Sequence, residues 1–302
     1  MRTLEFPTYI NWNYTYICNF NCKHCYSRGL DCNELSTDAY KKIAKNIIDY
    51  HVFQVNLGGG EPLLRKDIFQ IIKILSDKGV KVNLTTNGFL FDEEIASKLK
   101  EAGIGTLFIS LDDVRESEHD DFRNKIGSHK KVINCINLAK KYKIDVVLST
   151  VVTKKNLGIL EKIVNFAKEN KLTGIDFKRV RIQGNALKIV KDYALNEKDV
   201  NLLVKKIEKF KKHSGLKIFF IYSENGIKGV DEGCPCGRIS LALLPNGDLA
   251  PCVYNQYVIG NLLKENLAKI WQKSPLLLKL RSKFKCLGEM GAEDLKDYVR
   301  SN

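Results

Sequence analysis

The sequence predicts an α/β protein in which a partial barrel of six strand–helix units precedes a small α+β domain. Strand-like and helix-like segments alternate through the first two thirds of the 302 residues. An eight-unit barrel typically takes about 250 residues by itself, which leaves too little chain for a second domain. Beyond about residue 215 the alternation gives way to short strands and clustered cysteines. We place the domain boundary near residue 195, dividing the chain into 1–195 and 196–302.

The first two thirds contain six apolar strand candidates separated by amphipathic helices. The strand candidates are 9–17, 52–59, 80–86, 105–111, 144–152 and 174–182. The helical patterns cover 36–50, 68–75, 93–103, 128–142 and 156–169. In the second helix Ile68, Ile71, Ile72 and Leu75 follow helical spacing, and Gly79 is placed to end it. Such alternation predicts parallel strands joined by right-handed crossovers.

The last third follows a different pattern. A strand candidate at 216–222 precedes the cysteine-containing segment "EGCPCG". A hairpin is predicted from 239–244 and 249–254, because "PNGD" between them contains the Asn-Gly turn signal. A helix near 262–273 and a polar tail complete the chain. These elements predict the small α+β domain.

Composition excludes several classes of protein. With 44% hydrophobic and 28% charged residues the chain is typical of a globular protein. The start "MRTLEFPTYI" lacks the pattern of a signal peptide, and no run of eighteen apolar residues occurs. We therefore expect a cytoplasmic protein without a membrane partner. In that compartment the nine cysteines should be reduced or bound to metal.

The formal charge of +14 raises the question of an acidic partner. The lysines are spread along helix faces and mixed with acids, as in "KIEKFKKH", which favours a solvated surface. We do not expect a nucleic-acid partner. A basic nucleic-acid-binding protein with zinc cysteines is the alternative that tight, salt-dependent RNA binding without iron would restore.

Three cysteines lie close together in "CNFNCKHCY", directly after the first predicted strand. Cys18, Cys22 and Cys25 on one short loop are able to bind an iron–sulfur cluster or zinc. A cubane cluster has four irons, so three cysteines leave one coordination position open, as in catalytic metal sites. The loop follows a strand at the carboxyl end of the barrel, where such folds build active sites.

The cysteine spacing resembles that of the radical S-adenosylmethionine (radical SAM) superfamily. "GGGEP", "TTNG" and "SLDD" end the second, third and fourth strands in the family's order. The resemblance implies a barrel of the radical SAM type and a [4Fe-4S] cluster on the three cysteines. It also implies that SAM is chelated by the fourth iron and reductively cleaved to a 5′-deoxyadenosyl radical, which abstracts hydrogen from the substrate.

The resemblance further implies a set of SAM-binding residues. Glu61 would hold the amino group, Arg123 the carboxylate, and Asn87 and Ser110 the ribose or methionyl part. Gly59 and Gly60 would allow close backbone approach. Tyr26, Val152 and Ile182 would border the adenine. The sequence identifies no catalytic acid or base.

A second group of cysteines occupies the last quarter and comprises Cys234, Cys236, Cys252 and Cys286. Four soft ligands from separate elements suit an iron–sulfur cluster or zinc. The segment "CPCGRISLALLPNGDLAPC" resembles the SPASM/Twitch extension of radical SAM enzymes. No cysteine follows Cys286, so we expect a Twitch-type domain with one auxiliary [4Fe-4S] cluster, which would aid substrate binding or electron transfer. Whether Cys236 is a ligand is left open.

Two cysteines belong to neither group. Cys135 shares a helix face with apolar residues and is expected to be a buried structural thiol, and Cys32 is expected to have no role.

The resemblance implies a radical SAM oxidoreductase or maturase that acts on a peptide. The alternatives are cofactor, tetrapyrrole or other small-molecule biosynthesis, and, in another class, a non-catalytic iron–sulfur electron carrier. A ferredoxin- or flavodoxin-type reductant would be needed, and a separate leader-binding partner is an option for a peptide substrate. Lys178, Arg179 and Arg181 lie near the barrel mouth, where they would either meet a carboxylate-rich substrate or form ordinary surface ion pairs.

Overall fold

A computed structural model describes residues 4–31, 33–220, 234–255 and 257–283. Its described strands form one curved sheet in the order β10-β9-β8-β1-β2-β3-β4-β5-β6-β7. The central part consists of the six predicted parallel strands, which confirms the α/β fold class. They are β1 (Tyr9–Thr15), β2 (Gln54–Gly59), β3 (Lys81–Thr86), β4 (Thr106–Ser110), β5 (Asp145–Val152) and β6 (Gly174–Arg179).

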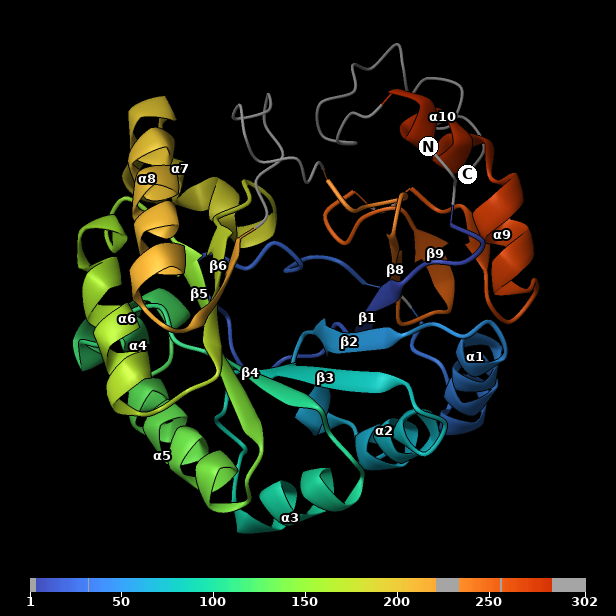
Figure 1. Cartoon of the computed structure of the whole chain (residues 1–302), viewed down its shortest axis with the longest axis horizontal. Helices are drawn as coiled ribbons and strands as arrows, with labels where there is room; N and C mark the ends of the chain where they lie inside the picture. The colour runs from blue at the N-terminus through green and yellow to red at the C-terminus, as the bar shows by residue number, and fades with distance from the viewer. Residues whose placement is uncertain (1–3, 32, 221–233, 256, 284–302) are drawn as a thin grey trace.

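The helices that connect these strands cover the outer, convex face of the sheet (Figure 1), except for the short fourth helix, which packs against the fifth. They are α1 (Thr37–Asp49), α2 (Ile68–Ser76), α3 (Glu93–Glu101), α4 (Glu116–Arg123), α5 (Ser128–Lys141) and α6 (Leu160–Glu169). Shorter turns η1 (Pro62–Leu64) and η2 (Leu157–Ile159) lie between strands and helices. After β6 come η3 (Gly184–Lys188), α7 (Val190–Tyr193) and α8 (Glu197–His213).

The core lies between the sheet and these helices. In α2 the predicted face is buried, with Ile68, Ile71, Ile72 and Leu75 all fully covered. Removing a leucine- or isoleucine-sized side chain from water stabilises the fold by roughly 1.5–3 kcal/mol, so faces of this kind fix the helices on the strands. The opposite face of the sheet is left to line the interior of the partial barrel.

Helix α4 has no counterpart in the sequence prediction. Its sequence, "ESEHDDFR", lacks the apolar periodicity of an amphipathic helix. The side chains that it buries are mainly polar, and they include His119, Asp120 and Arg123. Hydrogen bonds and charge therefore hold this helix in place together with the one buried aromatic ring, that of Phe122.

The C-terminal strands extend the same sheet at both edges. Strand β7 (Lys217–Phe220) pairs with β6, and β8 (Ser240–Leu243) pairs in parallel with β1. The predicted hairpin is present: β9 (Asp248–Ala250) runs antiparallel to β8, followed by β10 (Gly260–Asn261). The hairpin therefore continues the barrel sheet beside β1 (Figure 1). The boundary near residue 195 stays a prediction.

Two differences concern the last helices. The helix predicted from 262 begins later, as α9 (Leu267–Lys273), because the Asn266 side chain accepts a hydrogen bond from the Lys269 amide and caps it there. The chain after it is not simply a polar tail, since α10 (Pro275–Lys283) is a helix. It buries Leu277 and Leu280 between charged residues. Among the described helices, none is both long and apolar enough to cross a membrane.

Candidate active site

The loop that follows β1 carries the first three cysteines into a cavity at the carboxyl ends of the strands. Cys18, Cys22 and Cys25 all line this cavity, which we call the central cavity. Burial raises the pKa of the Cys22 thiol to about 11, although the neighbouring Arg123 guanidinium opposes the shift. Burial also raises the pKa of Cys18. Thiols that lose hydration in this way gain most from a cation that stabilises the thiolate.

The end of β2 lies directly against the start of this loop. The amide of Gly60 donates to the Thr15 carbonyl over 2.6 Å. A Cβ on Gly60 would lie 2.1 Å from the Ile17 carbonyl oxygen, and a Cβ on Gly59 would lie 2.3 Å from that of Thr15. Gly59 also has a φ of +106°. Glycine is therefore required at both positions so that the two segments can approach.

The carboxylate of Glu61 is buried beneath the cavity wall and linked to β3. It accepts hydrogen bonds from the Asn87 amide and the Thr86 hydroxyl, each at 2.8 Å. Burial raises its pKa to about 7, and these hydrogen bonds limit the rise. The Asn87 side chain in turn donates to Asn19 Oδ1 at 2.8 Å. Glu61 thus positions Asn87, which lines the cavity and contacts the cysteine loop.

The end of α4 also packs against the cysteine loop, where the Lys23 amide donates to the Phe122 carbonyl at 3.1 Å. Arg123 Nε donates to Asp112 Oδ2 at 2.6 Å, and both side chains are buried. Burial alone would raise the pKa of Asp112, but the Arg123 charge and the nearby histidines hold it below its usual range. The ring of Phe122 stacks on His24 with centroids 4.3 Å apart. Arg123 therefore lines the cavity as half of a buried ion pair.

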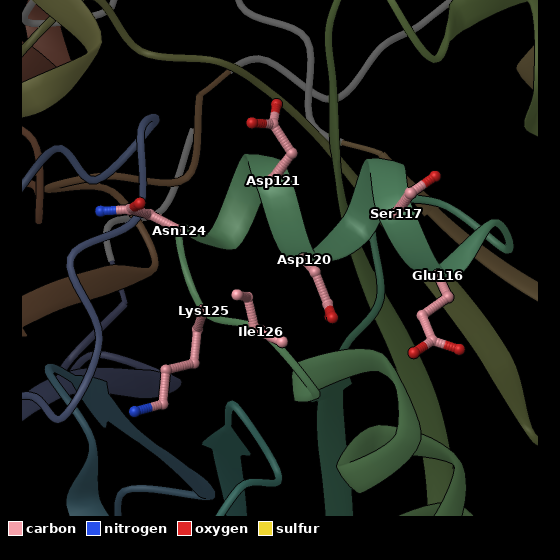
Figure 2. Close-up of a pocket in the computed structure, with 7 residues that line it drawn as sticks. All are labelled: Glu116, Ser117, Asp120, Asp121, Asn124, Lys125 and Ile126. Carbon is pink, nitrogen blue, oxygen red and sulfur yellow. The ribbon is translucent and has the colours of Figure 1, made fainter.

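A surface hollow lies beside α4 and the segment that follows it (Figure 2). Its lining comprises Glu116, Ser117, Asp120, Asp121, Asn124, Lys125 and Ile126. The Asp120 carboxylate accepts from the Gly127 amide, the Ser128 hydroxyl and the His129 amide at 2.6–2.8 Å. Asp120 thus organises the start of α5, and none of the predicted site residues borders this hollow.

The described members of the second cysteine group also lie together. The Cys236 thiol is hydrogen-bonded to both Cys234 and Cys252. That hydrogen bond from Cys236 lowers the pKa of Cys252 to about 7, and the Tyr254 amide helps at 3.4 Å from its sulfur. Cys286 lies outside the described residues, as does Cys32. Cys135, by contrast, is fully buried in the core against Gly88, as expected.

Comparison with known families identifies the domains that contain these two cysteine groups. The family described as the radical SAM superfamily matches residues 12–167. The iron–sulfur cluster-binding domain SPASM matches residues 234–290. The chain belongs to the radical SAM superfamily. It is therefore an enzyme whose cofactors are a [4Fe-4S] cluster and SAM, and its SPASM domain implies auxiliary iron–sulfur ligation.

Individual relatives share the architecture over nearly the whole chain. The AdoMet-dependent heme synthase of Methanosarcina barkeri is 26% identical, over 96% of this chain and 89% of its own. The mycofactocin maturase MftC of Mycolicibacterium smegmatis is 30% identical, over 93% of this chain and 74% of its own. Streptococcus suis SuiB, solved bound to the precursor peptide SuiA, superimposes with a TM-score of 0.78 at 20% identity. That structure covers 93% of this chain and 68% of SuiB, and it shows the shared fold.

The described residues fit the cofactors of a radical SAM enzyme. Three soft thiol donors border one cavity, with no other strong ligand type among its lining residues except His24. That donor set suits an iron–sulfur cluster with one open iron. Of the predicted SAM-binding residues, the central cavity is lined by Tyr26, Gly59, Gly60, Asn87, Ser110 and Arg123. Their individual contacts to SAM stay predictions.

Three of the predicted residues lie outside the cavity lining. Glu61 is fully buried behind the lining, where it holds the Asn87 amide. Val152 is packed in the hydrophobic core, and Val151 lines the cavity instead. Successive side chains of a strand point to opposite faces, so Ser149 and Val151 share the inner face of β5 and Val152 faces the helices. Ile182 is 40% exposed and outside the cavity lining, whereas Val180 and Arg181 belong to it. Val151, Val180 and Arg181 thus line the cavity near the positions predicted to border the adenine, and which residues contact the adenine stays a prediction.

Sequence reasoning missed the segment after β6 that supports the cluster loop. The Asn185 amide donates to the Cys25 carbonyl at 2.9 Å, and its side chain donates to the Cys22 carbonyl at 3.0 Å. Gly184 has a φ of +56°, and a Cβ there would lie 2.5 Å from the Cys25 oxygen. The signal was a Gly-Asn pair at a strand end, where turn residues are common.

Proposed function

We propose that this radical SAM enzyme is a maturase that oxidises a peptide substrate in the central cavity. The observation that carries the proposal is the position of Tyr254, two residues beyond Cys252. Tyr254 lines the same cavity as Cys18, Cys22 and Cys25. The first cysteine group therefore borders this cavity directly, and the second group lies next to it through Tyr254, which follows Cys252 by two residues. A substrate in the cavity would then have one iron–sulfur site beside it and a second one behind the Tyr254 ring. That arrangement suits a net oxidation, for which a second electron must leave the substrate.

The similarity to MftC, named as a maturase, supports a peptide over other substrates. The cluster and SAM would supply the hydrogen-abstracting radical, and the chain's own residues prepare the cavity. Gly59 and Gly60 let the strand ends close against the cysteine loop. The buried Arg123–Asp112 pair keeps a cation fixed at the cavity wall. A ferredoxin- or flavodoxin-type protein is the proposed electron donor.

A tetrapyrrole is the second candidate substrate. The heme synthase relative is covered over 89% of its length, more than the 74% of MftC. Carboxylate-bearing macrocycles also match the basic residues of the cavity wall, which include Lys178 and Arg181. This candidate assigns the same radical chemistry and the same cavity to a different molecule.

Parallel assays with the two substrate classes test the proposal. The anaerobically reconstituted enzyme would be reduced with dithionite and given SAM, with either a precursor peptide encoded beside its gene or Fe-coproporphyrin III. With the peptide we expect 5′-deoxyadenosine to form and the peptide to lose mass. With the porphyrin we expect neither change. A Cys22→Ala variant is the control that should form neither product. Modification of the porphyrin with an unchanged peptide would overturn the peptide assignment.

A further inference from the structure

The wall of the central cavity at the end of β6 is strongly cationic. Lys178, Arg179 and Arg181 line it there, and Arg28 and Arg123 line it from the cysteine loop and α4. Among its described lining residues there is no aspartate or glutamate. A low-dielectric cavity with one sign of charge attracts a ligand of the opposite sign.

Two of these cations are already paired within the protein. Arg123 is bound to Asp112. Lys178 Nζ lies 3.0 Å from Asp176 Oδ2 and donates to Ser149 Oγ at 2.9 Å. Burial opposes the charged form of Lys178, but the attraction of Asp176 raises its pKa, so the amine stays protonated. Its side chain is still 37% exposed toward the cavity, which leaves donor capacity for a ligand.

Arg181, which follows β6, has no such partner among the described residues. Its guanidinium lies over the ring of Tyr254, 4.9 Å from the centroid. In the part of the chain that the structure describes, no carboxylate pairs with it. The ring orients the guanidinium plane but supplies no formal negative charge of its own.

We propose that Arg181 and Lys178, with the Tyr254 ring, form a carboxylate-binding subsite for the substrate. The inference rests on the proposed function and narrows its substrate to one that carries a carboxylate near the reacting carbon. A planar guanidinium pairs with a carboxylate through two parallel hydrogen bonds, and an ammonium adds a third, charge-assisted one. A peptide terminus or acidic side chain supplies this group, as do the propionates of a tetrapyrrole.

The carboxylate of SAM is the competing ligand for the same charges. The two are separable because Arg123 lies on α4, beside Cys22, whereas Arg181 follows β6, beside Tyr254. If Arg181 serves the substrate, its removal weakens substrate binding and leaves the dissociation constant of SAM unchanged. If it serves SAM, both constants rise together.

Binding of paired acid and neutral probes tests the subsite. The reconstituted full chain with SAM would be titrated with coproporphyrin III and its tetramethyl ester. It would also be titrated with the precursor peptide and with a neutral counterpart, in which the C-terminus is amidated and each Asp and Glu is replaced by Asn and Gln. We expect at least one acid to bind more tightly than its neutral partner. Arg181→Gln should weaken that acid roughly tenfold to a hundredfold, and Arg181→Lys less. Which acid responds identifies the source of the carboxylate.

Matched controls separate this inference from the proposed function. Lys198→Gln removes an exposed lysine of α8 and should change no binding constant. If Arg181→Gln weakens the binding of the neutral probes or of SAM as much as that of the acid, the subsite proposal is wrong. Equal binding of acid and neutral probes by the unaltered enzyme would also overturn it. SAM cleavage and product mass are measured independently of the binding constants. The binding data can therefore disprove the carboxylate subsite while the maturase proposal stands, and the product assays can disprove the maturase proposal while the subsite stands.

Discussion

The ring of Tyr254 lies edge-on against the ring of Tyr26, with centroids 4.8 Å apart and planes at 70°. Tyr26 follows Cys25, and Tyr254 lies two residues after Cys252. One aromatic contact therefore joins the loop of the first cysteine group to that of the second. Both rings line the central cavity.

A double-mutant cycle on this pair tests whether the contact couples the two loops. Tyr26→Leu and Tyr254→Leu each remove one ring while keeping an apolar side chain. Edge-to-face pairs contribute about 0.5–1.5 kcal/mol beyond area burial, so we expect a coupling energy of that size in the free energy of unfolding, measured in urea. Strict additivity of the two changes would mean that the rings touch without stabilising each other.

The buried carboxyl of Glu61 predicts a pH dependence of stability. Its pKa rises to about 7 in the folded protein from 4.5. The folded state therefore binds the proton more tightly, and this group's contribution declines as the pH rises from about 4.5 to 7, by an amount on the order of 3 kcal/mol. The difference in the free energy of unfolding between the unaltered chain and Glu61→Gln should follow that decline. A difference that stays constant from pH 4.5 to 7 would contradict the assignment.

The Arg123–Asp112 pair predicts strong non-additivity. Removing one partner leaves a buried charge uncompensated, which costs about 3–5 kcal/mol. Arg123→Met and Asp112→Asn should each lower the free energy of unfolding by about this much, and the double variant by much less than the sum. Lys209→Met, which breaks an exposed ion pair with Glu161, is the control and should cost under about 1 kcal/mol. Additive losses would argue that the two side chains act separately.

Removal of the Asn185 side chain should weaken the retention of the iron–sulfur cluster without unfolding the protein. Asn185→Ala removes the hydrogen bonds to the Cys22 carbonyl and to Asn21 Oδ1. The loop should then hold iron less tightly, which a faster rate of iron release to a chelator would show. Asn170→Ala removes an amide that bonds only within the end of α6, so its release rate should match that of the unaltered enzyme. Equal rates in both variants would remove Asn185 from the loop's support.

Much of the fold was predictable because its signals are local. The amphipathic face of α2 and the Asn-Gly turn of the β8–β9 hairpin each specify structure from a few neighbouring residues. Helix α4 was not predictable in this way, because its burial depends on Asp112 and on the loop after Asp120, which its own periodicity does not show.

The sequence predicted which residues gather at the site better than it predicted the contacts between them. The cysteines and glycines follow strand ends in a fixed order, so their gathering at one edge of the sheet could be expected. Which side chain faces the cavity depends on the phase of each strand, and this explains the exchange of Val152 for Val151. The support from Asn185 joins positions more than 150 residues apart, and no local pattern in the sequence predicts such a contact.

The proposed oxidation depends on a second iron–sulfur site that is separate from the first, and metal content tests whether that site exists. A variant with Cys18, Cys22 and Cys25 all changed to Ala would be reconstituted anaerobically, and its iron and sulfide measured. About four irons per chain should remain, held by Cys234, Cys236, Cys252 and the predicted ligand Cys286. If this variant retains no iron, or if it binds zinc in place of iron, the second iron–sulfur site does not exist.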